Sequence, residues 1–357
     1  MGGHRLDDGI RQAHGPSPVA VGPFDVLDRV AREEAESGTL APGATRATGA
    51  GDRARPEQPD PVRTCFERDR DRILHSSAFR RLAGKTQVFI FPADHQRTRL
   101  THALEVAQVA TAIARACRLN VALTEAIALG HDCGHGPGGH ASEDALTVFV
   151  PGGFDHAVWG ADVTAAHLNL CAETLDGIRN HSWSRPSPAT PEGQVVGLAD
   201  RMAYCAHDWE DAVHAGVVAG SELPAVVAER CGRSRSSQLR TWIGDAVATT
   251  AGAGMVAISD AQAEALAALR RFNYERIYLR QESQDQAGAV IRLLRALVDH
   301  YGGHPELMPT GGELDHPDPR LRAVAYVGGM TDRFACQQAV GLLGWAHTDL
   351  PRQQAGT

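Results

Sequence analysis

The stretch ALGHDCGHGPGGHASE, residues 128–143, decides how the rest of the chain is interpreted. Just before it, Leu123 and Ile127 lie four residues apart, and His131 follows at the same spacing with Asp132 beside it. An apolar helical stripe therefore ends on a histidine. A glycine-rich turn with two further histidines follows. Titratable groups are thus concentrated at the end of a core helix, which indicates a functional site.

Outward from this stretch, the chain shows helical periodicity almost everywhere from Pro61 onward. An amphipathic stripe with helical spacing is formed by Val106, Val109, Ala110, Ile113 and Cys117. Thr190-Pro191 is typical of a helix N-cap with proline at the first position, and it predicts a long helix through about Ala215. Further helices are expected over residues 271–300 and 320–345. Since convincing alternating strand patterns are absent, the sequence predicts one all-α domain without internal repeats.

The two ends of the chain differ from this body. Residues 1–61 are rich in Gly, Pro, Ala and Arg with little periodicity, and they predict a mostly disordered arm that folding does not need. The helical body is expected over residues 62–348, and a flexible tail over residues 349–357.

Composition limits the classes of function. The net charge of -8 argues against a surface devoted to nucleic acid, although binding of nucleic acid stays open. No stretch of eighteen uncharged apolar residues occurs and the N-terminus lacks the apolar region of a secretory signal, so neither a membrane span nor export is expected. The seven cysteines are scattered singly, which predicts a reducing cytoplasm.

Several polar residues occur at helix positions that face the core. His102 lies four residues before Val106, and Asp200 lies four residues after Val196. Buried imidazoles and carboxylates are costly unless they are paired or bind metal. Together with His131 and Asp132, they form a ligand set suited to a divalent cation with open water positions.

Each of these signals is weak when it stands alone. A single histidine on an apolar face is usually a hydrogen-bonded core residue. The pair His131-Asp132 is also weak, because His207-Asp208 repeats it. Asp208 itself continues the stripe through Asp200 and Tyr204, so we expect it to face the same cavity as a ligand-binding group.

His140 and Glu143 are three residues apart, which places both on one helix face. Glu143 can then fix the tautomer of His140 as a general acid. The alternative for Glu143 is a solvated carboxylate at a helix start, where the helix dipole favours it.

Arginines are the second class of candidates. Arg99 lies three residues before His102 and shares its face, and a guanidinium binds phosphate oxygens bidentately. An arginine cluster also occurs at positions 68, 70, 72, 80 and 81. We interpret this cluster mainly as intrahelical pairing with Glu67, Asp69 and Asp71, with phosphate or nucleic-acid binding as the alternative.

Five motifs follow one another along the chain: RDRDRILHSSAFRRLAGKTQVF at 68–89, RTRLTHALEVAQ at 97–108, ALGHDCGH at 128–135, LADRMAYCAHD at 198–208 and GGMTDRFA at 328–335. In this order they resemble the deoxyguanosine triphosphate triphosphohydrolase-like family of HD-domain metal-dependent phosphohydrolases. The resemblance covers about residues 62–348. It implies an HD-domain helical bundle with additional C-terminal helices.

The resemblance also implies roles for individual residues. The metal ligands would be His102, His131, Asp132 and Asp200, holding a divalent ion such as Mn, Mg, Fe, Co or Ni. The catalytic residues would be His140 and Glu143, with His156 as a second active-site imidazole. The substrate-binding residues would be Arg99, His135, Arg201, Tyr204 and Asp208, with Tyr274 as a sugar-side contact. Members of the family are commonly homo-oligomers.

Two departures from the family pattern bear on base and sugar preference. This chain has Gly138-Gly139 before His140 where the family usually has Phe-Gly, and Ala157-Val-Trp159-Gly160 after His156 where the family commonly has Asn-Ala-Gln-Ser.

The function implied is hydrolysis of a deoxynucleoside triphosphate at the α-phosphorus, giving nucleoside and tripolyphosphate. One alternative is another hydrolase on the same metal centre, acting on nucleoside monophosphates or signalling nucleotides. The other is a non-catalytic nucleotide-sensing protein. The presence of all four ligands together with His140 and Glu143 argues against this last possibility.

Overall fold

The computed structural model describes all residues except 1–3, 6–8, 13–19, 91–95, 312–315 and 353–357. The described residues form fifteen α-helices, and their strands are one short antiparallel pair, β1 (His4–Arg5) with β2 (Arg11–Gln12). The prediction of an all-α protein is confirmed. None of the described helices is long and apolar enough to cross a membrane.

The α-helices, in chain order, are α1 Arg29–Thr39, α2 Cys65–His75, α3 Ser77–Arg81, α4 Arg99–Ala116, α5 Val121–Gly130, α6 Ala141–Leu146, α7 His156–Trp159, α8 Ala172–Asn180, α9 Pro191–His214, α10 Ala225–Arg230, α11 Arg235–Ala253, α12 Asp260–Asn273, α13 Gln281–Gly303, α14 Pro319–Gly328 and α15 Asp332–Leu343. Short 3-10 turns lie at η1 Leu82–Gly84, η2 Thr147–Phe149, η4 Ala166–Leu168, η5 Gly220–Glu222, η7 Pro305–Leu307 and η9 His347–Asp349, and π-helical turns at η3 Gly160–Thr164 and η6 Tyr274–Tyr278.

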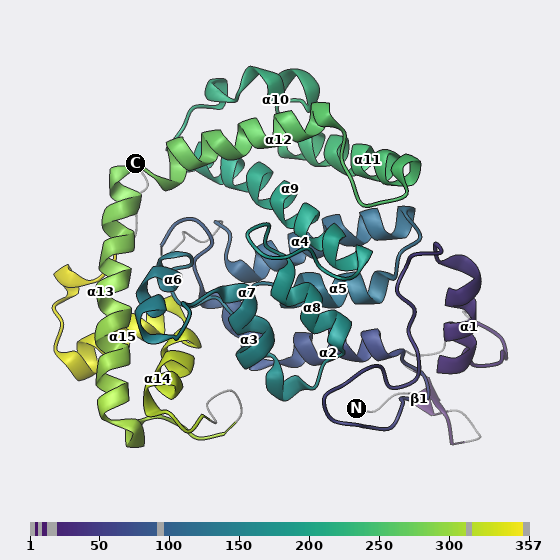
Figure 1. Ribbon diagram of the computed structural model, residues 1–357, viewed down its shortest axis with the longest axis horizontal. Coiled ribbons are helices and arrows are strands. Elements are labelled where there is room, and N and C mark those ends of the chain that lie inside the picture. Colours follow the sequence, from purple (N-terminus) through teal and green to yellow (C-terminus); the bar gives the residue numbers. More distant parts are fainter. Residues whose placement is uncertain (1–3, 6–8, 13–19, 91–95, 312–315, 353–357) are drawn as a thin grey trace.

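The main core is built by α2, α4, α5, α8 and α9, which pack on one another at the centre of Figure 1. The predicted α4 stripe is buried: Val106, Val109, Ala110 and Ile113 have no exposed surface. The core helices α5 and α8 approach closely where a glycine lies at their interface. A Cβ on Gly177 of α8 would lie 2.4 Å from the Cδ1 of Ile127 on α5, so only glycine fits there.

A second core lies among α6, α13, α14 and α15, at the left of Figure 1. The helix expected over residues 271–300 is instead divided between α12 and α13 by the π-helical turn η6. The stretch 320–345 is likewise divided, because α14 ends near Gly329 and Thr331 caps α15. By contrast, the expected α9 begins where predicted, with the Thr190 side chain accepting a hydrogen bond from the backbone of Gly193.

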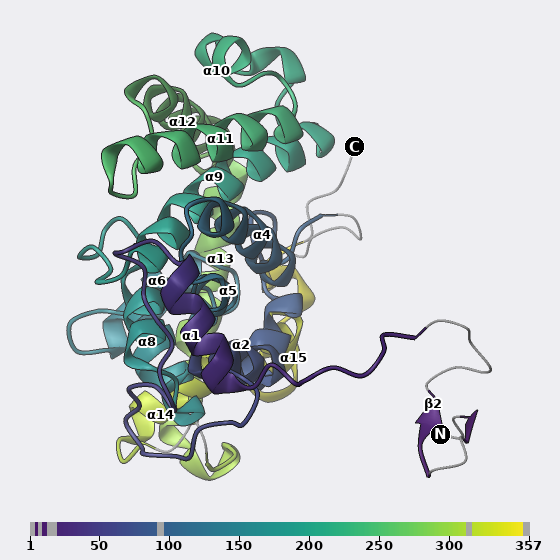
Figure 2. The same cartoon turned by 90° about the vertical axis from the view of Figure 1, so that its right-hand side faces the viewer.

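The expectation of a disordered arm over residues 1–61 is wrong for residues 29–57. Helix α1 lies on the body, and Ala44 and Ala47 in the segment after it are buried. Thr45 donates backbone and side-chain hydrogen bonds of 3.1 and 2.7 Å to the fully buried carboxylate of Glu192 on α9. Residues 20–28, in contrast, run outward from the body (Figure 2).

A buried ion pair also attaches this segment to the body. Nη1 of Arg53 lies 2.6 Å from Oδ1 of Asp69 on α2, and both side chains are almost fully buried. The other carboxylate oxygen of Asp69 accepts hydrogen bonds from the backbone of Cys171 and the hydroxyl of Thr174. Asp69 therefore joins the N-terminal segment, α2 and α8. The composition of the segment hid this attachment because it depends on polar contacts rather than on an apolar stripe.

The predicted C-terminal tail lies partly outside the described residues. Where it is described, Pro351 is buried and the backbone N–H of Arg352 donates a 2.8 Å hydrogen bond to Gln286 on α13.

These contacts predict different effects for two N-terminal truncations. A chain that starts at Asp28 should keep its melting temperature, because residues 20–27 lie outside the packed body. A chain that starts at Pro56 loses Arg53 and leaves Asp69 as a buried unpaired charge, which costs about 3–5 kcal/mol of stability. Thermal melts followed by circular dichroism measure both. Equal melting temperatures for the two truncations would contradict the structural role of the segment.

Candidate metal centre and active site

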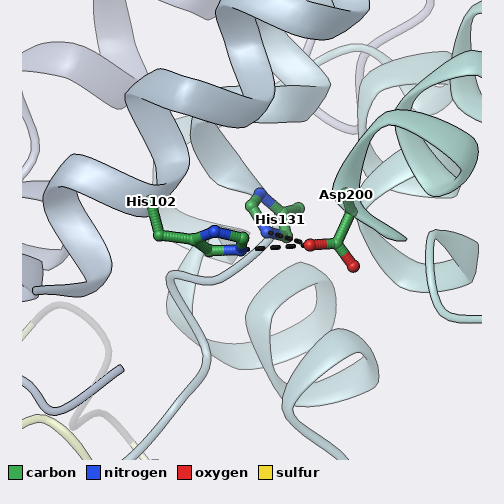
Figure 3. Close-up of side chains that lie close together, drawn as sticks. All are labelled: His102, His131 and Asp200. Atoms are coloured by element: carbon green, nitrogen blue, oxygen red, sulfur yellow. Dashed lines mark hydrogen bonds and ion pairs between the residues drawn. The ribbon is translucent and has the colours of Figure 1, made fainter. Parts of the chain in front are cut away.

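Three core helices bring His102, His131 and Asp200 together (Figure 3). Nε2 of His102 on α4 lies 3.0 Å from Oδ1 of Asp200 on α9, and Nε2 of His131, at the end of α5, lies 3.8 Å from the same oxygen. Nδ1 of His131 donates to the backbone oxygen of Ala128 at 2.7 Å. Because a carbonyl oxygen only accepts, this bond leaves the lone pair on Nε2, as a metal ligand requires.

Asp132 lies beside this group and is buried. Its Oδ2 accepts a 2.6 Å charged hydrogen bond from Arg99 and lies 3.9 Å from Nε2 of His102. Its Oδ1 lies 3.5 Å from Nε2 of His131. Burial alone would raise the pKa of Asp132, but Arg99 and the neighbouring histidines hold that pKa well below its usual range. Asp132 therefore stays a carboxylate inside the core.

The four predicted ligands thus lie within one cluster, in which His102, His131 and Asp132 are buried and Asp200 is partly exposed. Hydrogen bonding with His102 outweighs burial and lowers the pKa of Asp200 to about 2. Buried Nε2 of His131 and Nδ1 of His135 have no hydrogen-bond partner among the described residues. Imidazole nitrogens with free lone pairs beside two carboxylates suit a divalent first-row metal ion, so the residues fit the cation that the sequence predicts.

Next to this cluster, Glu143 joins two histidines. Its Oε2 lies 3.2 Å from Nδ1 of His140, and its Oε1 lies 2.5 Å from Nδ1 of His156 and 3.0 Å from that residue's backbone nitrogen. Burial would raise the pKa of Glu143, but the bonds from His140 and His156 lower it strongly. Glu143 therefore lies in the first turn of α6, as the alternative expected, but its carboxylate is bonded to two imidazoles rather than freely solvated. The His140 side chain is 76% exposed, so it can meet a substrate.

Comparison with known proteins agrees with this geometry. An HD domain model matches residues 99–205, and a phosphohydrolase-associated domain model matches residues 256–340. The deoxyguanosinetriphosphate triphosphohydrolase-like protein of Caldanaerobacter subterraneus is 42% identical over 312 residues, covering 85% of this chain and 92% of that protein. The protein of the same name from Clostridium perfringens strain 13 is 42% identical over 303 residues, covering 80% and 89%. The chain belongs to this family.

As a member of the family, the chain is an HD-domain phosphohydrolase, so the predictions of family and enzyme class are confirmed. Among solved structures, a hypothetical protein from Aquifex aeolicus superposes with a TM-score of 0.50 at 17% identity, covering 79% of this chain and 69% of that chain. This likeness concerns the fold alone.

The family's phosphohydrolase-associated region reaches the site through the glycine-rich turn. The Asp332 side chain accepts hydrogen bonds from the backbone of Gly138 at 2.8 Å and of Thr86 at 2.9 Å. The buried ammonium of Lys85 donates to the backbone oxygens of His135 and Gly328. Asp332 and Lys85 therefore fix the backbone that carries His135 and His140, and each links it to the C-terminal helices, Asp332 as part of α15 and Lys85 through Gly328 of α14.

The same turn explains one departure from the family pattern. Gly138 has a φ of +73°, a conformation that side chains rarely adopt, and a Cβ there would lie 2.6 Å from Cγ1 of Val290 on α13. A phenylalanine at this position would therefore meet both backbone strain and a steric clash. The α13 packing accounts for glycine here, and the turn presents no aromatic side chain beside His140.

The predicted substrate-binding residues divide into three groups. Arg99 and His135 lie in the metal cluster: Arg99 pairs with Asp132, and the His135 ring stacks on His156 at 3.7 Å. Burial, with the nearby Arg99 charge, holds the pKa of His135 well below its usual value, so its ring is neutral.

Three others form a row of arginine–aromatic contacts. The Arg201 guanidinium stacks 3.4 Å over the ring of Trp183. The Tyr204 hydroxyl accepts a 3.0 Å bond from Arg270, whose guanidinium carbon lies 4.8 Å from the centre of the Tyr274 ring. Sequence reasoning did not identify Trp183 or Arg270, since neither falls in a motif.

Asp208 on α9 has two hydrogen-bond partners of its own. It is buried, but its two oxygens are bonded by Arg97 and by the Tyr278 hydroxyl, and it is not among the grouped metal-ligand candidates of the described residues. Arg97 also pairs with Asp211 at 2.9 Å. Asp208 therefore lies two turns beyond Asp200, in a charged network with Arg97 and Tyr278, and its role as a ligand-binding group stays a prediction.

The arginine cluster on α2 and α3 follows the structural interpretation in part. Arg70 pairs with Asp71 at 2.7 Å, but Arg72 pairs with Glu57 of the N-terminal segment at the same distance. Arg68 also pairs with Glu57, and Glu67 and Asp69 pair with Arg32 and Arg53. The prediction of charge pairing is therefore right, but most partners lie outside the helix.

One histidine of the cluster was missed. His181, directly after α8, is buried, and its Nδ1 donates to the backbone oxygen of Ile178 at 2.8 Å. Burial and the neighbouring histidines lower its pKa to about 4, so the ring is neutral. The signal was present in the sequence, since Thr174, Ile178 and His181 follow the spacing of a buried helix face.

We expect the Asp200→Ala variant to bind a divalent metal at least about 10-fold more weakly than the wild type. Removing a residue that only hydrogen-bonds to a metal ligand already weakens metal binding by about that factor, and Asp200 is assigned as a ligand itself. Its far-UV circular dichroism should not change, because Asp200 lies at the edge of the core and is 20% exposed. Elemental analysis after dialysis measures the bound metal. The control is Asp162→Ala, which removes an exposed ion pair with Arg179 and should retain metal. Full occupancy in Asp200→Ala would contradict the assignment.

Proposed function

We propose that this phosphohydrolase cleaves a deoxynucleoside triphosphate at the α-phosphorus, giving nucleoside and tripolyphosphate. The observation that carries the proposal is the chain of hydrogen bonds from His140 through Glu143 to His156, directly beside the cluster of His102, His131, Asp132 and Asp200. The names of the relatives, deoxyguanosinetriphosphate triphosphohydrolase-like proteins, support the substrate class.

We assign the four-residue cluster as the site of one divalent cation. A cation bound there lowers the pKa of a coordinated water and polarises a phosphoryl oxygen. Arg99 holds Asp132 ionised and in place, so its part in phosphate binding is indirect. Arg201 stacks on Trp183 and remains cationic, so it can meet the phosphate tail from the α9 side.

His140 is the group we assign to the leaving oxygen. Glu143 accepts from Nδ1 of His140, which leaves Nε2 of the exposed ring to face the substrate. When His140 carries a proton on Nε2, it can donate that proton to the departing 5′-oxygen of the sugar. His156, anchored by the other oxygen of Glu143, keeps the carboxylate in this orientation.

We also infer that the protein works in the cytoplasm. All seven cysteines are free, as a reducing compartment favours.

Self-association, the helical domain over residues 62–348 and the metal's identity stay predictions. Size-exclusion chromatography with light scattering measures the first.

The reaction is tested by its products. If water attacks the α-phosphorus, a deoxynucleoside triphosphate gives nucleoside and intact tripolyphosphate, and oxygen from labelled water appears on the tripolyphosphate. Mass spectrometry of a mixed nucleotide pool measures both and reports the preferred base. Stepwise release of orthophosphate with diphosphate and monophosphate intermediates would overturn the proposal in favour of a phosphomonoesterase. No hydrolysis of any nucleotide by metal-loaded protein would favour a sensing role.

The role of His140 has its own test. His140→Gln should keep metal and substrate binding but lower kcat by about 10²- to 10⁴-fold, the scale of a positioned proton donor. A substrate with a better leaving group at the 5′ position should recover much of this loss, because that group departs without the proton. If the better leaving group brings no recovery, His140 is not the acid.

A further inference from the structure

Two cysteines that are far apart in the sequence lie together beneath the N-terminal segment. Cys65 is the first residue of α2, Cys171 caps the start of α8, and both are buried. A Cβ on Gly51 would lie 2.4 Å from Sγ of Cys171 and 3.3 Å from Sγ of Cys65. Both sulfurs therefore lie against the same glycine, and this glycine has no side chain to separate them.

The buried ion pair between Arg53 and Asp69 holds the backbone of both cysteines. Nη2 of Arg53 donates a 2.9 Å hydrogen bond to the backbone oxygen of Cys65, and Oδ2 of Asp69 accepts one of 2.8 Å from the backbone nitrogen of Cys171. The backbone of Arg53 also pairs with that of Cys171 in an isolated antiparallel bridge. The fold itself therefore keeps the two thiols side by side.

One of the two thiols is prepared to react. A thiolate, and not a thiol, is the nucleophile in cysteine chemistry. Hydrogen bonding with the Cys171 thiol and with the backbone of Thr48 lowers the pKa of Cys65 against the effect of burial, and the same contact raises the pKa of Cys171. Cys65 also begins a helix, where the free N–H groups of the first turn favour negative charge. Cys65 is therefore the nucleophile of the pair, and Cys171 is its neighbouring thiol.

We propose that Cys65 and Cys171 form a reversible disulfide when the protein meets a peroxide. The Cys65 thiolate attacks one oxygen of hydrogen peroxide, the O–O bond breaks, and the released hydroxide takes up the proton that the thiol lost. The sulfur of Cys171 then attacks the resulting sulfenic acid: the S–S bond forms, the S–O bond breaks, and the hydroxyl leaves as water with the proton of Cys171. Two thiols and one peroxide thus give one disulfide and two waters. Hydrogen peroxide is small and uncharged, and it reaches the buried pair when the segment at Gly51 opens locally.

The disulfide would protect the fold without using a residue of the active site. It closes the chain between residues 65 and 171 into a loop, which contains most of the assigned metal ligands together with His140 and Glu143. A cross-link restricts the unfolded chain, and it does so more strongly when the loop is long. The oxidised protein should therefore resist unfolding. In a reducing compartment, dithiol reductants return the pair to thiols.

The experiment maps thiols on the full-length protein. Reduced, folded protein is treated with a small molar excess of hydrogen peroxide, the remaining thiols are alkylated after denaturation, and mass spectrometry of the digest identifies each cysteine. Five of the seven thiols should remain, with Cys65 joined to Cys171. The melting temperature should rise by several degrees, and dithiothreitol should reverse both changes. Cys65→Ser should keep its six thiols, and peroxide should not change its melting temperature.

Cys117 provides the matched control. It is the one cysteine of the seven that is partly exposed, and the other six are buried. If accessibility alone decided which thiol is oxidised, Cys117 would react first. Cys117→Ser should instead still form the disulfide and show the same rise in melting temperature as the wild type.

The other outcomes overturn the proposal. Loss of Cys117 alone would mean that exposure decides, and conversion of Cys65 to a sulfinic acid with Cys171 unmodified would mean that the two sulfurs do not meet. Seven intact thiols after treatment of the folded protein would show that the pair does not react. A disulfide without a rise in melting temperature would overturn the protective role. If Cys65→Ser does not fold, the digest of the wild type still decides, and none of these measurements involves the metal or a nucleotide.

Discussion

The structure depends on one constraint, which is that ionised carboxylates lie in the apolar core and must be neutralised there. Asp132 is buried among Arg99 and the histidines, and Glu143 is held by two imidazoles. An uncompensated charge in such a place costs several kcal/mol, about 3–5 when one partner of a buried pair is removed. The helices α4, α5, α8 and α9 each supply one part of this balance. The packing of these helices and the ionisation of the site's carboxylates therefore depend on the same contacts.

The second core contributes to the site without entering it. Asp332 of α15 binds the backbone of the glycine-rich turn, and Val290 of α13 leaves no space for a side chain at Gly138. Lys85, which precedes α4, links the same turn to the backbone of Gly328 on α14. The helices that follow the HD domain thus set the path of the loop that carries His140. This gives a physical reason why the two matched regions, residues 99–205 and 256–340, occur in one chain.

The N-terminal segment follows the same constraint. Arg53 neutralises Asp69, and Thr45 bonds to Glu192, each a carboxylate inside the core. A segment without an amphipathic stripe can therefore be part of the fold when it supplies hydrogen-bond donors to buried acids. The prediction of a disordered arm used the low apolar content of residues 1–61. Part of this arm is held in place by charged and polar contacts instead.

The sequence by itself determined the helical class, the start of α9 at Thr190-Pro191 and the gathering of His102, His131, Asp132 and Asp200. The first two, and the core-facing positions of these residues, follow from local sequence, because a residue's face on a helix depends only on its neighbours along the chain. That they form one ligand set came from the resemblance to the family. Tertiary structure alone decided which groups pair: Arg99 with Asp132, Asp208 with Arg97, and Glu143 with His156. Periodicity gives the direction of a side chain, but a partner in space comes from another helix, and only the packing of helices fixes the distance between them.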